Sequence, residues 1–480
     1  MTTLHTAQSR CRAGASRGDI TPPVGIYHRM WGAALHDRAT GVHRPLTATA
    51  LWLEDDSGQA AQLVLALDHC LLDRVEIDAI RAAVGRHTPL DPAQVQVCLT
   101  HTHGSGWMSR SRADLPGGDL VGPYLDRLAA NCGSLAGEAM AARQPATIVY
   151  GTGRCDLARH RDFLDETRGQ YVCGFHPAGP ADDTLLVARI AADDGRTVAT
   201  AVNYACHPTT LAWLNTLISP DYVGTLREVV ERETGAPCLF LQGASGDLGP
   251  REGFVGDTAV ADRNGRQVGF AALSILESLP SPATKFIYAG PVISGAVIGT
   301  WRHEPLTANE QERLTAWQSS QRVVELAYRT DLPTLEDSRR ELARWQAAEA
   351  AARASGSEDE LRNCRARCEQ LTRQVARLAL LPAGAAYPYS VNLLRLGNAV
   401  WLFLPGELYQ VFQTTLRRRF PRQALLIATL ANDWQPGYLP AAGAYGKGIY
   451  QDEIAAVAQG SLEQLIAAVG DEIERLIGPH

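Results

Sequence analysis

Three histidines have the spacing to do metal chemistry. His101 and His103 follow the apolar run Val95–Leu99, and His207 follows a second apolar run, Ala199–Ala205. Neutral imidazole is a good ligand for zinc. In open α/β sheets, ligand-binding residues gather at the carboxyl ends of buried strands. The pattern therefore predicts a catalytic metal site, and strand alternation predicts that His101 and His103 face the same pocket.

Each candidate ligand also has a structural alternative. Two histidines after a strand can cap a loop or lie at the surface, and a single histidine such as His207 can be a hydrogen-bonded part of the core. Pro208 forces an extended backbone on His207, which ends the strand and presents the imidazole at its rim. Glu407 follows Pro405-Gly406 after another apolar run. Its spacing fits a helix-start charge as well as a metal ligand.

Short apolar runs and helical patterns must position these residues. The runs are rich in Val, Ile and Leu, which suits strands covered on both faces. Helical patterns lie between some of them, so we predict an α/β fold with a mixed β-sheet core flanked by helices. The runs are Gln62–Leu67, Val95–Leu99, Ala199–Ala205, Cys238–Leu241, Val400–Leu404 and Leu425–Leu430, and the helical patterns are Val75–Val84, Leu125–Ala142 and Val223–Glu233. Each run ends in polar side chains, so we expect the six ends to converge on one site.

Residues 306–384 differ from the rest of the chain, because they are rich in Ala, Arg, Glu, Leu and Gln and poor in glycine. Leu361, Cys364, Cys368 and Leu371 follow the spacing of a heptad seam. We predict a helical hairpin inserted between residues 1–305 and 385–480, which together form the catalytic domain. Cys364 and Cys368 have the spacing of a metal pair, but no histidine lies nearby, which favours the seam. The hairpin offers a surface for homo-oligomer formation.

Composition narrows the choice of partners. The chain has 480 residues, of which 45% are hydrophobic and 20% charged, so a large core can form without disulfides. Its net charge of −7 disfavours binding to nucleic acid. No apolar stretch approaches the roughly 18 residues of a membrane span, so no stable membrane insertion is expected. The first residues contain no apolar signal region and the ten cysteines are scattered, which predicts a cytoplasmic protein with reduced thiols.

The order of the motifs resembles the neutral/alkaline (non-lysosomal) ceramidase family, in its N-terminal catalytic domain. The resemblance covers about 18–300 and 387–451. Because the sequence ends at His480, soon after these motifs, we expect no counterpart of the family's C-terminal immunoglobulin-like domain. The segments that carry it are Gly18-Asp19-Ile20-Thr21-Pro22-Pro23, Gly41-Val42-His43-Arg44-Pro45-Leu46, Thr100-His101-Thr102-His103, Asn203-Tyr204-Ala205-Cys206-His207-Pro208, Ser219-Pro220-Asp221-Tyr222-Val223-Gly224, Gly246-Asp247-Leu248, Pro405-Gly406-Glu407, and the spacing of Tyr438, Tyr445 and Tyr450.

The resemblance implies a zinc ion (Zn2+) and assigns roles to residues. The implied ligands are His101, His207, Glu407 and Tyr438. His103 would contact the substrate carbonyl, and Tyr450 and Arg161 would line the site. Zinc activates water and polarises a carbonyl, which implies amide hydrolysis with His103 or Tyr450 stabilising the oxyanion or protonating the leaving amine. Asp68 and Asp247 are candidates to orient the ligand histidines, with strand-end caps as the alternative.

One departure from the family bears on the substrate. Gly249 stands where the family has a serine thought to contribute to catalysis. We therefore predict a zinc-dependent amidohydrolase acting on a linear amide, a small or polar N-acyl molecule. The alternatives are a true ceramidase acting on N-acylsphingosine, a biosynthetic acyl-transfer or cyclisation enzyme with the same metal site, and a non-catalytic scaffold that binds its partner through the hairpin.

Overall fold

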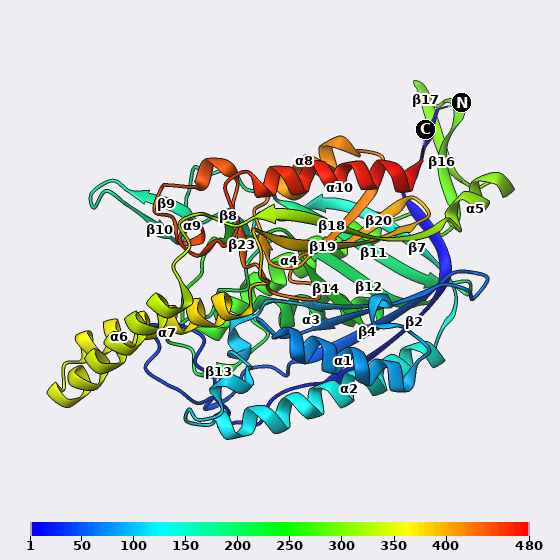
Figure 1. The fold of residues 1–480 in the computed structure, drawn as a ribbon. Helices are drawn as coiled ribbons and strands as arrows, with labels where there is room; N and C mark the ends of the chain where they lie inside the picture. Colours follow the sequence, from blue (N-terminus) through cyan, green and yellow to red (C-terminus); the bar gives the residue numbers. More distant parts are fainter. Residues whose placement is uncertain (1, 479–480) are drawn as a thin grey trace.

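Two mixed sheets packed face to face form the centre of the structure, a computed structural model that describes residues 2–478 (Figure 1). The larger sheet has the order β14 (Cys238–Gln242), β12 (Thr197–Tyr204), β11 (Thr184–Ala192), β7 (Gln144–Arg154), β2 (Gln8–Asp19), β4 (Thr47–Glu54), β5 (Ala61–Leu67) and β6 (Val95–Leu99). The smaller sheet has the order β18 (Trp317–Ala327), β19 (Ala386–Leu396), β20 (Ala399–Phe403) and β22 (Ala424–Ala428).

Helices cover the outer face of each sheet, so the molecule has four layers. One half of the larger sheet packs against α1 (Arg74–His87) and α2 (Val121–Ala141), and the other half against α3 (Tyr222–Thr234) and α4 (Thr258–Ser278). The smaller sheet packs against α8 (Val411–Arg419) and α10 (Ser461–Ile477). This arrangement confirms the predicted α/β fold with a mixed sheet core flanked by helices.

Strand β4 illustrates why these runs are apolar throughout. Its alternate residues Leu51 and Leu53 face the second sheet, while Ala50 and Trp52 face the helices on the other side. A strand covered on both faces has no position left for a solvent-facing polar residue. The six apolar runs therefore became strands, with ends shifted by one or two residues at most.

Three parallel strand pairs bring the site loops to one edge. β5 pairs with β6, β12 with β14, and β20 with β22. The amide of Asn203 on β12 donates to the carbonyl oxygens of Leu241 and Ile427, at 2.9 and 2.8 Å, and so ties β12 and β14 to β22. The loops at this edge contain the short strand pairs β3 (Gly41–Val42) with β13 (Leu217–Ile218), β8 (Ala158–His160) with β15 (Leu248–Pro250), β9 (Asp162–Asp165) with β10 (Gln170–Cys173), and β21 (Glu407–Leu408) with β23 (Tyr438–Leu439).

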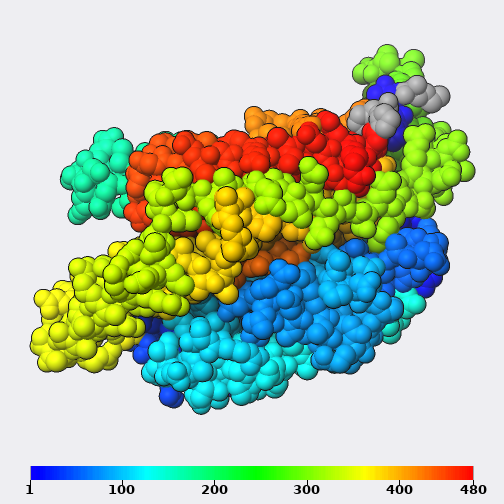
Figure 2. Space-filling view, viewed as in Figure 1, coloured from blue at the N-terminus to red at the C-terminus, as the bar shows by residue number. Residues whose placement is uncertain are grey.

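The inserted hairpin consists of α6 (Leu335–Ser355) and α7 (Glu358–Leu380), joined at Gly356 with a φ of +74°. It projects from the body of the molecule (Figures 1 and 2). It is shorter than the predicted range 306–384, because α5 (Ala308–Leu314) and β18 precede it. β18 pairs along its full length with β19, but only Val324 and Leu326 among its side chains are buried. Most of its other residues are polar, so the sequence gives little sign of a strand.

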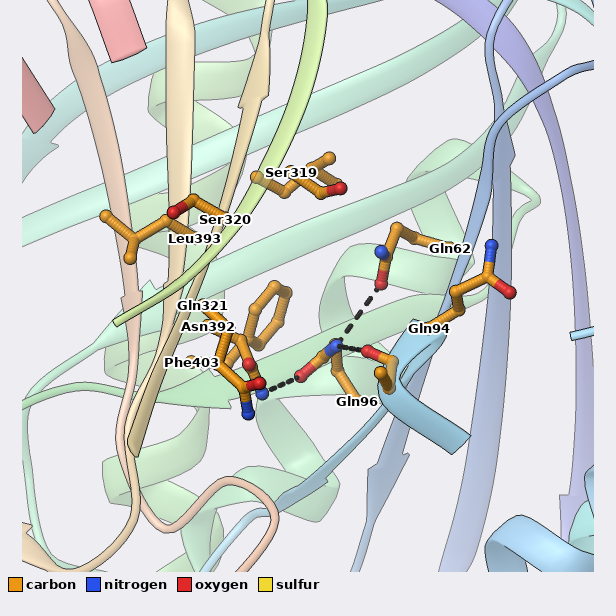
Figure 3. Close-up of a pocket in the computed structure, with 11 residues that line it drawn as sticks. Gln62, Gln94, Gln96, Ser319, Ser320, Gln321, Asn392, Leu393 and Phe403 are labelled. Carbon is orange, nitrogen blue, oxygen red and sulfur yellow. Dashed lines mark hydrogen bonds between the residues drawn. The ribbon is translucent and has the colours of Figure 1, made fainter. Parts of the chain in front are cut away.

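A small cavity of about 160 Å³, lined largely by polar side chains, lies between the two sheets and shares no residue with the histidine loops (Figure 3). The Gln96 amide donates to Gln62 Oε1 at 3.2 Å, and Gln96 Oε1 accepts from Asn392 at 3.1 Å, so the lining amides satisfy one another. A third sheet of β1 (Thr3–Leu4), β16 (Thr284–Ile293) and β17 (Val297–Pro305) lies near the N-terminus. Within residues 2–478 no helix has both the length and the apolar character needed to cross a membrane, and all ten cysteines are free thiols.

Candidate metal centre

Three side chains from three separate loops bring their ligand atoms together. The Nε2 atoms of His101 and His207 lie 3.0 Å apart. The carboxylate Oε2 of Glu407 lies 3.0 Å from His207 Nε2 and 3.3 Å from His101 Nε2. In a tetrahedral zinc site with bonds of about 2.0–2.1 Å, neighbouring donor atoms lie roughly 3.3 Å apart. The three separations fit a zinc ion bound between these atoms.

The hydrogen bonds of the two imidazoles also fit a metal. His101 Nδ1 lies 2.9 Å from the carbonyl oxygen of Cys70, and His207 Nδ1 lies 2.8 Å from that of Ser245. A carbonyl only accepts, so each Nδ1 carries the proton and each Nε2 presents a lone pair. Two lone pairs and a carboxylate at this distance need a cation between them. Cys70, His101 and His103 also lie close together, but Cys70 faces the Nδ1 side of His101, which already bears the proton.

Unusual backbone conformations at His101 and Gly406 orient the ligand side chains. His101 has a φ of +66°, a left-handed conformation that is unusual for a residue with a Cβ and is typical of functional sites. Gly406, with a φ of +74°, precedes Glu407, and a Cβ at Gly406 would lie 2.7 Å from the carbonyl oxygen of Gly437. Only glycine permits this close approach. It brings β21 beside β23, in which Glu407 stands opposite Tyr438.

The electrostatics of the cluster favour a positive charge. Burial raises the pKa of Glu407, but His101 and His207 hold it well below its usual range. Burial, together with the charge of Arg161, lowers the pKa of His207 to about 4. Burial lowers the pKa of His101, yet Cys70 and Glu407 raise it well above its ordinary value. Glu407 is therefore ionised, His207 is neutral, and His101 attracts a proton. A bound metal cation would stabilise all three groups.

Tyr438 and Arg161 complete the cluster. Tyr438 Oη lies 3.3 Å from His207 Nε2. Arg161 Nη2 donates to Tyr438 Oη at 2.9 Å and to the carbonyl oxygen of Gly246 at 2.6 Å. Burial raises the pKa of Tyr438 well above its usual value, and the Arg161 guanidinium opposes that shift. The structure thus brings together the four implied ligands His101, His207, Glu407 and Tyr438, with Arg161 positioned to stabilise a phenolate.

A cavity of about 540 Å³ opens on the cluster. Its walls include five bulky aromatic residues and four polar or charged residues of α7. These are Trp31, Trp107, Trp213, Phe254 and Trp434, and Glu369, Gln370, Arg373 and Arg377. The predicted Tyr450, the first residue of α9 (Tyr450–Ile454), also lines the cavity, with its ring centre 6.0 Å from that of Tyr438.

His103 faces the cavity with unused hydrogen-bonding capacity. Neither of its buried ring nitrogens has a partner within residues 2–478. Burial and the neighbouring His101 and His207 hold its pKa well below the ordinary value, so the imidazole is neutral. Its ring centre lies 4.9 Å from that of His101. The two rings share the pocket as predicted, through the left-handed turn at His101 and a 3₁₀ turn over His103–Ser105 rather than through strand alternation.

The expectation that Asp68 and Asp247 orient the ligand histidines is not what the structure shows. The Asp247 carboxylate accepts from the backbone and side-chain nitrogens of Gln410, at 2.8 and 2.9 Å. The Asp68 carboxylate is fully buried against the guanidinium of Arg227, at 2.7 and 2.5 Å. Main-chain carbonyls hold the histidines instead. Both carboxylates therefore stabilise the loops around the site, and Asp247 does so by hydrogen bonding to Gln410 in the segment after Glu407.

Sequence reasoning missed three residues of the cavity. The Thr209 hydroxyl is buried and has no partner within the described residues, and it lies 3.9 Å from the place of a Cβ on Gly249. Its position two residues after His207 was a signal that could have identified it. Arg373 and Arg377 lie one turn apart on α7, where their spacing is that of an ordinary solvent-facing helix. The sequence alone contains no signal for these two.

The comparisons with known proteins identify the fold. No protein-family model matches the chain, and no curated protein matches it. A crystal structure of neutral ceramidase from Pseudomonas aeruginosa superimposes with a TM-score of 0.64 at 16% identity, over 98% of this chain and 75% of the other. A structure described as ceramidase complexed with C2 matches with the same score and identity, over 98% and 76%. The chain therefore has the fold of the neutral ceramidases, as its motifs predicted.

Proposed function

We propose that this protein is a zinc-dependent hydrolase that cleaves the carbon–nitrogen bond of a small or polar N-acyl substrate. The main support is the convergence of two imidazole lone pairs, a carboxylate and a tyrosine on the wall of one cavity. When bound, zinc supplies Lewis-acid polarisation of a carbonyl and lowers the pKa of water toward neutrality. The ceramidase fold adds support, because both structural neighbours are named as ceramidases.

The chain's own residues supply the remaining functions. His103 is neutral and has a free N–H with which to donate to the substrate carbonyl oxygen, and the Thr209 hydroxyl donates beside it. Arg161 holds Tyr438 in place through its 2.9 Å hydrogen bond. The Tyr450 hydroxyl lines the cavity, is protonated at neutral pH as an ordinary phenol is, and is available to the leaving amine.

The wall formed by α7 favours a polar substrate. Glu369, Gln370, Arg373 and Arg377 present charged and amide groups to the cavity, which would be costly to cover with an alkyl chain. The aromatic wall of Trp31, Trp213 and Phe254 favours the second candidate, a true ceramidase. Hydrolysis and acyl transfer share the attack on an activated carbonyl, so added amine acceptors must be tested for acyl-transfer products.

The purified protein is expected to contain about one zinc per chain and to release amine faster from short N-acyl amines than from N-acylsphingosine. Elemental analysis measures the metal, and amine release measures the preference. A clear preference for the long-chain lipid would overturn the substrate assignment in favour of the ceramidase. Absence of amine release from every amide tested, by zinc-loaded protein, would overturn the proposed function.

Replacing Thr209 by valine is expected to lower kcat roughly tenfold to hundredfold without loss of zinc, because one hydrogen-bond donor to the developing oxyanion is removed. Thr209→Ser keeps the hydroxyl and is the matched control. A Cβ on Gly249 would meet only ordinary contacts at 3.9 Å, so Gly249→Ser can be added to the Thr209→Val protein. Partial recovery of kcat is expected there, and an unchanged kcat in Thr209→Val would contradict the role of the hydroxyl.

A further inference from the structure

We propose that the substrate carries a carboxylate close to the scissile amide, and that Arg377 binds it. This inference rests on the proposed function and names its substrate class. Arg377 lines the cavity and is only 9% exposed. Its Cδ lies 3.8 Å from the place of a Cβ on Gly437, the residue before the implied ligand Tyr438. The side chain therefore lines the same cavity as the metal cluster and passes close to the backbone next to Tyr438.

Arg377 differs from the other charged residues of the cavity in having no hydrogen-bonded or ion-paired partner within residues 2–478. Within residues 2–478 its guanidinium makes no ion pair or hydrogen bond, and Tyr450 is the one titratable neighbour that favours its charged form. Burial lowers the pKa of Arg377. A guanidinium remains protonated in proteins, so the buried charge persists. An uncompensated buried charge is costly, and a ligand that supplies the anion removes that cost.

The other charged side chains of the cavity already have hydrogen-bonded partners. Glu369 accepts from Arg112 at 2.9 and 3.0 Å and from Arg373 Nε at 3.0 Å. Arg373 also donates to the carbonyl oxygen of Met30. Arg161 is engaged by Tyr438 and the Gly246 carbonyl oxygen. Glu407 belongs to the metal cluster. Arg377 is therefore the charged group that the protein leaves for the substrate.

A carboxylate suits this position better than other acceptors. It matches the fork of a guanidinium with two parallel hydrogen bonds, which adds geometric selectivity to charge attraction. The metal cluster engages the amide carbonyl, and Arg377 engages the carboxylate at a fixed distance from it. Two substrate types share this chemistry: N-acyl amino acids, with the carboxylate on the amine side, and amides of dicarboxylic acids, with the carboxylate on the acyl side.

The test measures ligand binding and not turnover, so its outcome does not depend on the proposed hydrolysis. Short isosteres in which a methylene replaces the amide nitrogen cannot be hydrolysed. Each is made with a carboxylate on the acyl side or on the amine side, and each is paired with its neutral carboxamide. Calorimetry on the zinc-loaded wild type is expected to show roughly tenfold to hundredfold tighter binding of one carboxylate than of its carboxamide. The preferred isomer identifies the side that bears the carboxylate.

In Arg377→Gln this preference is expected to disappear, and in Arg377→Lys to be partly kept. Arg362→Gln is the matched control, because Arg362 lies on α7 but pairs only with the exposed Asp359. Equal binding of carboxylate and carboxamide by the wild type would overturn the proposal, as would a preference that survives in Arg377→Gln. The isosteres are not cleaved, so their binding can be interpreted even if the protein does not hydrolyse amides.

Discussion

Replacement of His101 by alanine is expected to remove the zinc and to lower kcat/KM by about 10⁴-fold, equivalent to about 5.5 kcal/mol of transition-state stabilisation. His101 is 1% exposed, and its Nε2 lies 3.0 Å from His207 Nε2 and 3.3 Å from Glu407 Oε2. Without His101 the cluster loses one of its two neutral nitrogen donors, the ligand type that zinc prefers, and keeps one imidazole, one carboxylate and a tyrosine whose phenol must be deprotonated to bind well. Elemental analysis and steady-state kinetics on the same preparation measure both losses.

The control for this substitution is His303→Ala, because His303 is exposed on β17 and belongs to neither the cavity nor the cluster. A chelator is expected to inactivate the wild type to the same extent, and added zinc to restore it. Added zinc should not restore His101→Ala. Full zinc occupancy in His101→Ala would contradict the ligand assignment. Full activity in metal-free wild type would contradict the need for a metal.

The part of the site that lies at strand ends was predictable from sequence. Apolar runs that end in histidine indicate both the strand and the chemistry, so His101 and His207 follow from residue order alone. Glu407 and Tyr438 required more, because their approach depends on two-residue strands and on the positive φ of Gly406. Such short pairings leave no periodic signal in a sequence.

The remaining features depend on which surfaces meet. A buried strand has the same apolar sequence pattern whether a helix or a second sheet covers it. The face-to-face packing of the two sheets was therefore not predictable. Arg373 and Arg377 have the pattern of a solvent-facing helix, and only the docking of α7 over the cavity gives them a role. Asp247 shows the opposite case. Its position at a strand end suggested a role at the metal site, but its carboxylate accepts hydrogen bonds from Gln410 and stabilises a loop.

The docking of α7 depends on one buried carboxylate, and Glu369→Gln is expected to weaken it by about 3 kcal/mol at pH 7. Glu369 is 4% exposed and pairs with Arg112 and Arg373. Burial raises its pKa, but the two guanidiniums dominate and lower it from 4.5 to about 2. The neutral amide would leave the buried guanidinium of Arg112 and the partly buried one of Arg373 without their anion. Each tenfold change in an equilibrium constant is about 1.4 kcal/mol.

The pH dependence gives the sharper form of this prediction. A carboxylate with a lowered folded-state pKa contributes its full stability above the unfolded value of 4.5 and loses it as the pH falls toward 2. The difference between wild type and Glu369→Gln should therefore be largest at pH 7 and shrink below pH 4.5. Trp107 lies 4.8 and 4.7 Å from the guanidiniums of Arg112 and Arg373, so its fluorescence reports on urea unfolding of this contact. Glu360→Gln, at an exposed position of α7, is the control, and equal stability of Glu369→Gln and wild type at pH 7 would show that the ion pair does not hold the hairpin.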